Sequence, residues 1–189
     1  RFVNQYRIEA DSDGGWRGEY WGKMMRGATF VYSYTQNKDL YAILHKTVED
    51  MMASADDLGR ISTYPVNSEF DAWDLWSRKY VLLGMQYFME ICNEDDFNKK
   101  IIESMQKQVD YIISKIGPAT EGKKPITSAT NAWGGLNSSS ILEPIMKLYN
   151  ITKEKRYLDF AAHIVNEGGA DIVNIFDLAY DNKLYPYQY

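Results

Sequence analysis

The sequence predicts an all-α protein, an (α/α) toroid built of about three helical hairpins. Apolar residues recur at helical spacing almost everywhere from Trp21 to about Val165. The helices alternate between one that is apolar nearly all round and one that carries a single apolar stripe, as inner and outer layers do. A long loop follows each outer helix. Three such hairpins make about half of a six-hairpin ring, whose central pocket would lie at the amino ends of the inner helices.

Six helices are predicted from this periodicity. Their approximate ranges are 20–35, 38–54, 71–92, 95–116, 138–150 and 153–167. The first contains the apolar, small-residue run MMRGATFVYSY, and the second mixes apolar with charged residues. The third is apolar nearly all round (YVLLGMQYFM), which indicates burial on most sides. The fourth has one apolar stripe, formed by Phe97, Ile101, Met105, Val109, Ile112 and Ile116. In the last pair, ILEPIMKLY precedes KRYLDFAAHIV and the contrast is weaker.

A short polar turn followed by an aromatic residue or leucine recurs as TQNKDLY, CNEDDFN and ITKEKRYL. Its members Leu40, Phe97 and Tyr157 stand 57 and 60 residues apart. This period exceeds that of tetratricopeptide and HEAT repeats and fits one helical hairpin plus a long loop. The loops fall at about 55–70 and 117–137. Long loops without secondary structure are usually functional or disordered, and the aromatic and polar residues of these two favour function.

Composition limits the partners. Hydrophobic residues make up 45% and charged residues 25%, and the net charge is −5 with scattered basic residues, so neither a nucleic acid nor a membrane is expected as a partner. The single cysteine, Cys92, excludes a Cys-based zinc cluster, and no cofactor is expected in this chain. We expect residues 1–189 to form one partial domain of catalytic type, truncated at both ends and inactive alone. Half a ring leaves inner helices without neighbours, so the chain could form an oligomer.

Residues at the start of each inner helix should line the pocket. There a tryptophan accompanies a carboxylate, an amide or a basic side chain three times. Sugars need this mixture, because their C–H faces stack on aromatic rings while their hydroxyls hydrogen-bond to polar side chains. The predicted substrate-binding residues are Trp16, Arg17, Trp21, Asp71, Trp76, Arg78, Lys79, Asn131 and Trp133.

Two of the pocket carboxylates are candidates for catalysis. Glycoside hydrolysis generally uses two carboxyl groups about 5 to 9.5 Å apart, and Glu19 and Asp74 are the best pair that this chain offers. Structural roles compete with this hypothesis. Asp71 and Asp74 could cap the third helix, and Arg17 and Glu19 could form a surface ion pair.

Three segments carry a resemblance to a known family. GWRGEYWGKMMRGA, FDAWDLWSRKYVLLGMQYFMEI and GGLNSSSILEPIMKLYNITKEKRYLDFAAHIV follow one another with a spacing similar to that of the DUF1680 glycoside hydrolase family. That family includes the β-L-arabinofuranosidases of glycoside hydrolase family 127, and the resemblance covers nearly the whole chain. The patterns W-x-K-x-x-x-G and D-L-W-x-R-K-Y are its most specific parts.

The resemblance implies a catalytic (α/α)6 barrel followed by β-sandwich material, acting on plant or microbial glycans, in a periplasmic or secreted bacterial protein. It also implies a cysteine nucleophile and a glutamate beside zinc in a Cys-rich cluster, which would lie beyond Tyr189. The characterised arabinofuranosidases place sugar-binding histidines where this chain has Tyr80 and Ser138. The resemblance therefore leaves the sugar specificity open.

Two other readings remain. Another (α/α)-barrel sugar enzyme, an epimerase or a polysaccharide lyase, would use different chemistry. A lyase needs a Tyr or His base near a cation that neutralises a uronate, and Tyr80 beside Arg78 and Lys79 fits this pattern. A non-catalytic helical scaffold would instead expose an apolar groove to a protein partner.

Overall fold

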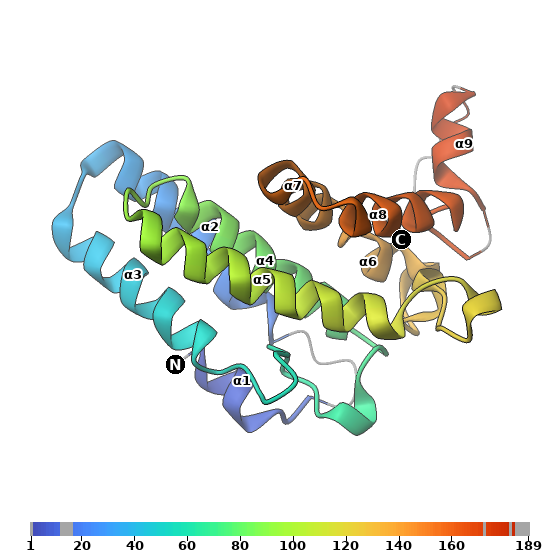
Figure 1. The fold of residues 1–189 in the computed structure, drawn as a ribbon, viewed down its shortest axis with the longest axis horizontal. Coiled ribbons are helices and arrows are strands. Elements are labelled where there is room, and N and C mark those ends of the chain that lie inside the picture. Colours follow the sequence, from blue (N-terminus) through green and yellow to red (C-terminus); the bar gives the residue numbers. More distant parts are fainter. Residues whose placement is uncertain (1, 12–16, 172, 182, 184–189) are drawn as a thin grey trace.

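The structure, a computed structural model, describes residues 2–11, 17–171, 173–181 and 183. The described residues fold into α-helices joined by turns and short 3₁₀ helices, which confirms the all-α class (Figure 1). The α-helices are α1 (Asn4–Ile8), α2 (Glu19–Thr35), α3 (Lys38–Met52), α4 (Asp74–Met89), α5 (Asp95–Lys115), α6 (Leu136–Ser139), α7 (Leu142–Thr152), α8 (Lys155–Asn166) and α9 (Ile175–Tyr180). The 3₁₀ helices are η1 (Val66–Ser68), η2 (Ala119–Glu121), η3 (Ile126–Ser128) and η4 (Trp133–Gly135).

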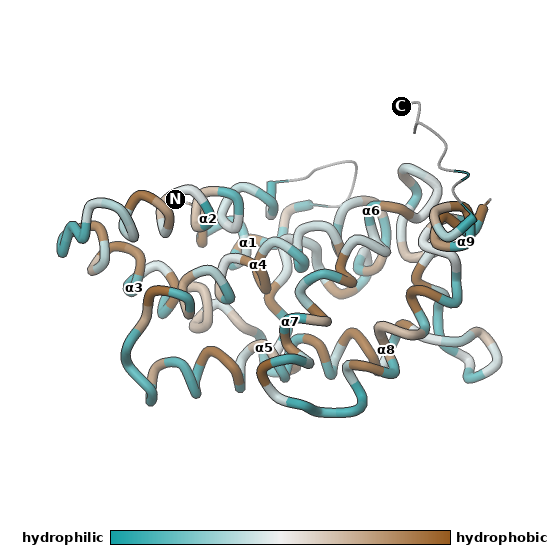
Figure 2. Tube along the Cα trace, turned by 90° about the horizontal axis from the view of Figure 1, so that it is seen from above, coloured by the Kyte–Doolittle hydropathy of each residue, from teal (hydrophilic) through white to brown (hydrophobic). Residues whose placement is uncertain are grey.

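The longer helices form three hairpins in two layers. Helices α2, α4 and α7 are the inner members. Each packs against the outer helix that follows it, α2 against α3, α4 against α5 and α7 against α8. Helix α4 also packs against α2 and α7, which joins the hairpins side by side. Seen from above, α2 and α4 lie on one side of the molecule and α5 and α8 on the other (Figure 2). This arrangement confirms the expected (α/α) toroid of helical hairpins.

Helix α4 is the centre of the core. It is buried on nearly all sides, as its apolar sequence predicted. Two glycines let α2 and α4 approach closely: a Cβ at Gly22 would lie 2.0 Å from the Tyr80 carbonyl oxygen, and one at Gly84 would lie 2.4 Å from the Trp21 ring. The two backbones are therefore in direct contact at this crossing.

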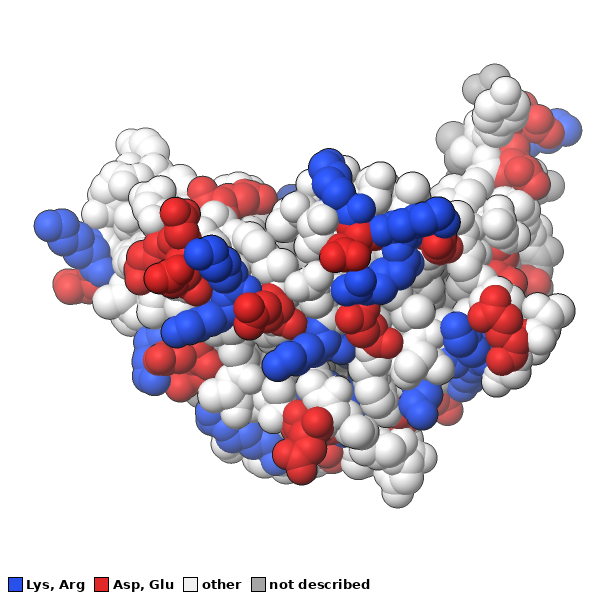
Figure 3. Space-filling view, viewed as in Figure 1, with Lys and Arg blue, Asp and Glu red and all other residues white. Residues whose placement is uncertain are grey.

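The outer helix α5 shows the expected single buried face. All six residues of its predicted stripe are buried, and Ile101, Met105 and Val109 are 0% exposed. Its amino end carries Asp95 and Asp96, and its last turn carries Lys115. These charges complement the helix dipole. On the surface seen in Figure 3, acidic and basic side chains are interspersed rather than segregated.

The structure differs from the sequence prediction in the fifth helix, which is split into α6 and α7. Pro144 lies in the first turn of α7, where its missing N–H is not needed, but its ring would clash with the carbonyl of Ser140 in a continuous helix. Helices α1 and α9 were not predicted, because five or six residues give too short a periodic signal. None of the described helices is long and apolar enough to cross a membrane.

Candidate functional site

Four aromatic side chains meet at the amino end of α4. Trp73 directly precedes α4, and Trp76 and Tyr80 follow it on the same face of the helix. Trp133 contacts the two tryptophans from the second long loop. The Trp133 ring centroid lies 4.7 Å from that of Trp73 and 5.8 Å from that of Trp76, edge to face. Trp76 and Tyr80 are 5.2 Å apart. We call these four residues the aromatic cluster.

Trp133 is held in an uncommon backbone conformation. Its φ is +52°, in the left-handed region that a bulky residue seldom adopts, and its side chain is 44% exposed. Gly134 and Gly135 follow with φ of +52° and +87°. A backbone conformation of this kind costs about 1–3 kcal/mol and is concentrated at functional sites. Here it holds a partly exposed indole against Trp73 and Trp76.

Charged groups surround the aromatic cluster. The Nε1–H of Trp76 donates to Glu19 Oε2 at 2.5 Å, and Lys23 Nζ lies 2.9 Å from the other oxygen of Glu19. Lys79 Nζ lies 4.5 Å from the Trp76 ring centroid and 5.1 Å from that of Tyr80. Burial lowers the pKa of Lys79 and raises the pKa of Tyr80. The arrangement presents aromatic edges and faces, one carboxylate and two ammonium groups.

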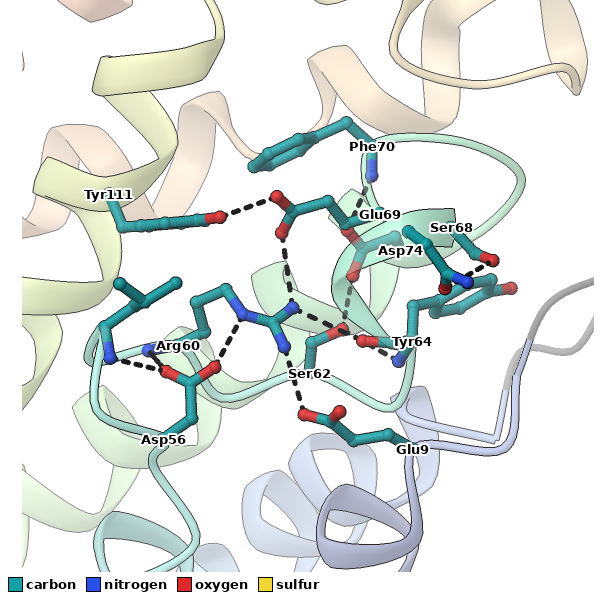
Figure 4. A network of polar contacts seen from close by, with 12 residues as sticks. Glu9, Asp56, Arg60, Ser62, Tyr64, Ser68, Glu69, Phe70, Asp74 and Tyr111 are labelled. Carbon is teal, nitrogen blue, oxygen red and sulfur yellow. Dashed lines mark hydrogen bonds and ion pairs between the residues drawn. The ribbon is translucent and has the colours of Figure 1, made fainter.

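A buried polar network lies beside this site and fixes the first long loop (Figure 4). Arg60 and Arg78 share the Glu69 carboxylate, with N–O distances of 3.2 and 2.8 Å. Tyr111 donates to the other Glu69 oxygen at 2.6 Å, and Asp56 pairs with Arg60 at 2.7 Å. Carboxylates and guanidinium groups satisfy one another here, as buried charges must.

Asp74, predicted to be catalytic, lies inside this network. The Asp74 side chain is 0% exposed and accepts hydrogen bonds from Ser62 Oγ at 2.6 Å and the Phe70 N–H at 2.8 Å. It also pairs with Arg78 Nε at 2.9 Å. The chain before α4 folds back over the first turn, so the carboxylate satisfies that loop instead of facing a substrate. The geometry gives no support to a catalytic pair of Glu19 and Asp74, and the catalytic role of Asp74 stays a prediction.

Arg78 and Trp21, which were predicted to bind substrate, are both buried. The Arg78 side chain is 3% exposed, and its guanidinium lies 4.6 Å from the Phe70 ring centroid. Trp21 is 2% exposed in the α2–α4 crossing, and its Nε1–H donates to Thr47 Oγ1 at 3.0 Å. Both residues are part of the core, because the helix faces that carry them turn toward neighbouring helices.

The other predicted site residues are spread over several places. Of these, the structure brings Glu19, Trp76, Lys79 and Trp133 together. Arg17 forms an ion pair with the buried Asp11, away from that group. Asp71 and Asn131 are exposed, and Trp16 lies outside the described residues. A binding role for Asp71, Asn131 and Arg17 stays a prediction.

Several contacts of the site were not predicted. The backbone before α4 has positive φ at Phe70 and Ala72, and it is tied to the second long loop through main-chain carbonyls. Lys124 Nζ donates to the Phe70 carbonyl at 2.7 Å, and Thr130 Oγ1 donates to the Ala72 carbonyl at 2.7 Å. Asn137 Nδ2 adds a second bond to the latter at 3.1 Å. No sequence signal marks such ties. Lys23 could have been found from its i,i+4 spacing to Glu19.

The described residues do not fit a zinc centre. They contain no group of three or more His, Cys, Asp or Glu side chains placed to hold a metal ion. The single cysteine, Cys92, is buried at the far end of α4, where the Tyr41 hydroxyl lies 3.6 Å from its sulfur.

The fold and the site together define part of a helical-hairpin toroid that has an aromatic and carboxylate site at the amino ends of its inner helices. Residues 4–184 match the family model of the β-L-arabinofuranosidase GH127 catalytic domain. The chain belongs to this family. A comparison with curated proteins found no significant match.

Two solved GH127 enzymes have the same fold. One is the β-L-arabinofuranosidase Ara127N from Geobacillus stearothermophilus T6, in its Se form, which aligns over 100% of this chain with a TM-score of 0.68 and 16% identity. The other is a GH127 β-arabinofuranosidase that aligns over 88% of this chain with a TM-score of 0.64 and 16% identity. The chain spans 30% and 28% of the lengths of these proteins.

Proposed function

We propose that this chain forms one wall of the substrate pocket of a glycoside hydrolase that acts on an arabinofuranoside-like or another plant or microbial glycan. The observation that carries the proposal is the Glu19–Trp76 pair: a carboxylate held by an indole N–H at 2.5 Å, within an aromatic cluster where two inner helices begin. Membership of the GH127 catalytic-domain family supports the same conclusion.

The chemistry of these groups suits a sugar. An aromatic ring can stack on the C–H face of a sugar ring, and a carboxylate accepts hydrogen bonds from its hydroxyls. The indole N–H and the Lys23 ammonium hold both Glu19 oxygens in place, which orients the carboxylate before a substrate arrives. We assign Glu19 as the candidate catalytic or hydroxyl-binding carboxylate. A second carboxyl group for hydrolysis would come from residues other than Asp74.

The test is steady-state hydrolysis by the complete protein, with a panel of aryl glycosides and oligosaccharides that includes arabinofuranosides. Loss of a stacking ring costs about 0.5–1.5 kcal/mol, so Trp76→Ala should raise KM up to about 10-fold. Tyr180→Ala, which removes a ring that is 91% exposed on α9, should leave KM unchanged.

Glu19→Gln separates catalysis from binding. A catalytic carboxylate predicts a fall in kcat of about 100-fold or more, whereas a hydroxyl-binding carboxylate predicts a change mainly in KM. Unchanged kinetics in both Glu19→Gln and Trp76→Ala would overturn the proposal.

The lyase alternative receives less support. It needs a cation near a tyrosine base. Arg78 is engaged by Glu69 and Asp74 in the buried network, which leaves Lys79 and Lys23 as the cations beside Tyr80. Burial also raises the pKa of Tyr80, which disfavours the phenolate that a base requires. The raised pKa of Tyr80 is the observation that favours hydrolysis over lyase chemistry.

A further inference from the structure

We propose that the sugar unit bound at the aromatic cluster is anionic, with a carboxylate or a sulfate ester that binds the ammonium groups of Lys79 and Lys23. This inference rests on the proposed function and specifies its substrate class. An uncharged sugar could use the aromatic rings and Glu19, but it offers no charge that neutralises the ammonium group of Lys79, and Lys23 is already paired with Glu19.

The first argument is the burial of Lys79. This residue is 9% exposed and lies over the Trp76 and Tyr80 rings, and it forms no ion pair with a carboxylate of any described residue. Lysine is almost never buried unless it is paired. The contact with two aromatic rings compensates part of the desolvation cost, because the ring faces attract a cation. A ligand anion would compensate the rest.

The second argument is the pairing of the neighbouring charges. Glu19 on α2 pairs with Lys23 at 2.9 Å, and Glu143 on α7 pairs with Lys147 at 3.5 Å. Both carboxylates are close enough to favour the charged form of Lys79, yet each is engaged by a lysine of its own. Within the described part of the chain, Lys79 therefore lacks a carboxylate of its own at this end of the inner helices.

The third argument is the position of Lys23. Its Nζ lies 5.2 Å from the Tyr80 ring centroid, and Lys79 Nζ lies 5.1 Å from the same centroid. Two ammonium groups over one phenol ring repel each other, and Lys23 disfavours the charged form of Lys79. An anionic group that contacts both would relieve this repulsion. Charge-assisted hydrogen bonds from ammonium groups to such an anion are short and strong.

The test is isothermal titration calorimetry with the complete protein and matched oligosaccharides. One set is neutral, one carries uronic acid and one carries sulfate esters. We expect at least one anionic set to bind about 10-fold or more tightly than the neutral set, since a charge-assisted hydrogen bond contributes about 1.5–3 kcal/mol. The two anionic sets tell a carboxylate from a sulfate.

Variants locate the effect. Lys79→Met should weaken anionic ligands by about 10-fold and leave neutral ligands within about twofold. Lys155→Met, which removes an exposed lysine paired with Asp159 on α8, is the control and should change neither. Because Lys79→Met removes a buried charge, the thermal midpoint of the variant protein should not fall below that of the native protein. A loss of binding would then not reflect unfolding.

A measurement on the unmodified protein gives an independent check. Affinity for the anionic set should fall as NaCl rises from 20 to about 500 mM, because salt screens charge–charge attraction, while neutral ligands should be indifferent. Tighter binding of the neutral set, or salt-independent binding of the anionic set, would overturn this inference and leave the proposed function standing. Binding of no glycan at all would remove the proposed function itself.

Discussion

At the scale of single residues, Glu69 organises the base of the site. Its carboxylate receives Arg60, Arg78 and the Tyr111 hydroxyl, and it is 9% exposed. Burial and the bond to Glu69 raise the pKa of Tyr111 to about 12, so the phenol stays a proton donor at neutral pH. This one carboxylate connects the first long loop to both α4 and α5.

Replacing Glu69 should therefore be costly. Glu69→Gln leaves two buried guanidinium groups without a shared counter-charge, and we expect it to lower the free energy of unfolding by about 3–5 kcal/mol in urea titrations. The control Glu49→Gln breaks an exposed pair with Lys46 and should cost less than about 1 kcal/mol. Similar small effects in both variants would mean that the network does not stabilise the fold.

A second residue-scale prediction concerns His163 and pH. The His163 side chain is 9% exposed and stacks near Phe160, and burial lowers its pKa. The unfolded chain then binds the proton more tightly than the folded chain does. Stability should fall as pH drops below the ordinary histidine value of about 6.5, and it should be unaffected by His163 above that value.

The measurement is the thermal midpoint at pH 7.5 and at pH 5.5 for the native protein and His163→Gln. Other groups titrate in this range, so the comparison is between the two proteins. A smaller decrease in the variant is the expected result, and an equal decrease would contradict the assignment.

At this scale, four residues of the site were predicted from the sequence. Glu19, Trp76, Lys79 and Trp133 were placed together because helix phase and loop order bring them to the same end of the hairpins. Asp74 and Arg78 have the same sequence signature as pocket residues. Only the folding back of the preceding loop, a tertiary contact without a local pattern, buries them in the network.

At the scale of elements, the crossing of α2 and α4 gives the sharpest prediction. Gly22→Ala would place a Cβ 2.0 Å from the Tyr80 carbonyl oxygen, and main chain cannot move aside as a flexible side chain can. Such overpacking costs about 1–3 kcal/mol or more, and it should displace Tyr80.

The matched control lies in the same helix. A Cβ at Gly27 meets no atom within 4 Å, so Gly27→Ala should stabilise α2 by about 0.5–1 kcal/mol through helix propensity. Circular dichroism with urea measures both effects. Equal destabilisation by both variants would contradict the close crossing as the cause.

The helices themselves were largely predictable, because long periodic segments carry a strong signal. The predicted ranges 38–54 and 95–116 agree closely with α3 and α5. The break between α6 and α7 depends on one proline ring meeting one carbonyl, and a helical period continues across it. The periodic pattern therefore predicts a helix in this region but not the break between α6 and α7.

At the scale of the whole molecule, α2 presents an uncovered apolar face. Tyr20, Met24, Val31 and Tyr34 lie on one side of the helix and are 43%, 57%, 53% and 91% exposed. An inner helix of a hairpin toroid would bury this face against a neighbour. Exposed apolar patches of this kind mark association surfaces.

We therefore expect the 189-residue chain to self-associate in sedimentation velocity runs at micromolar concentrations. The double variant with Met24→Lys and Val31→Lys should shift it toward monomer. Ile43→Lys is the control, because Ile43 is 64% exposed on the outer helix α3. Equal association of all three proteins would place the contact elsewhere.

The central position of α4 determines how slowly its backbone amides become exposed to solvent by local unfolding. Helix α4 packs against α2, α3, α5, α6 and α7, so its amides become accessible to solvent only when several hairpins separate together. In deuterium exchange its amide protons should be among the last to be replaced, and those of the short helices α1 and α9 among the first. The aromatic cluster begins on that slowest-opening helix, so a ligand would meet groups that hold their positions even while the edges of the molecule fluctuate.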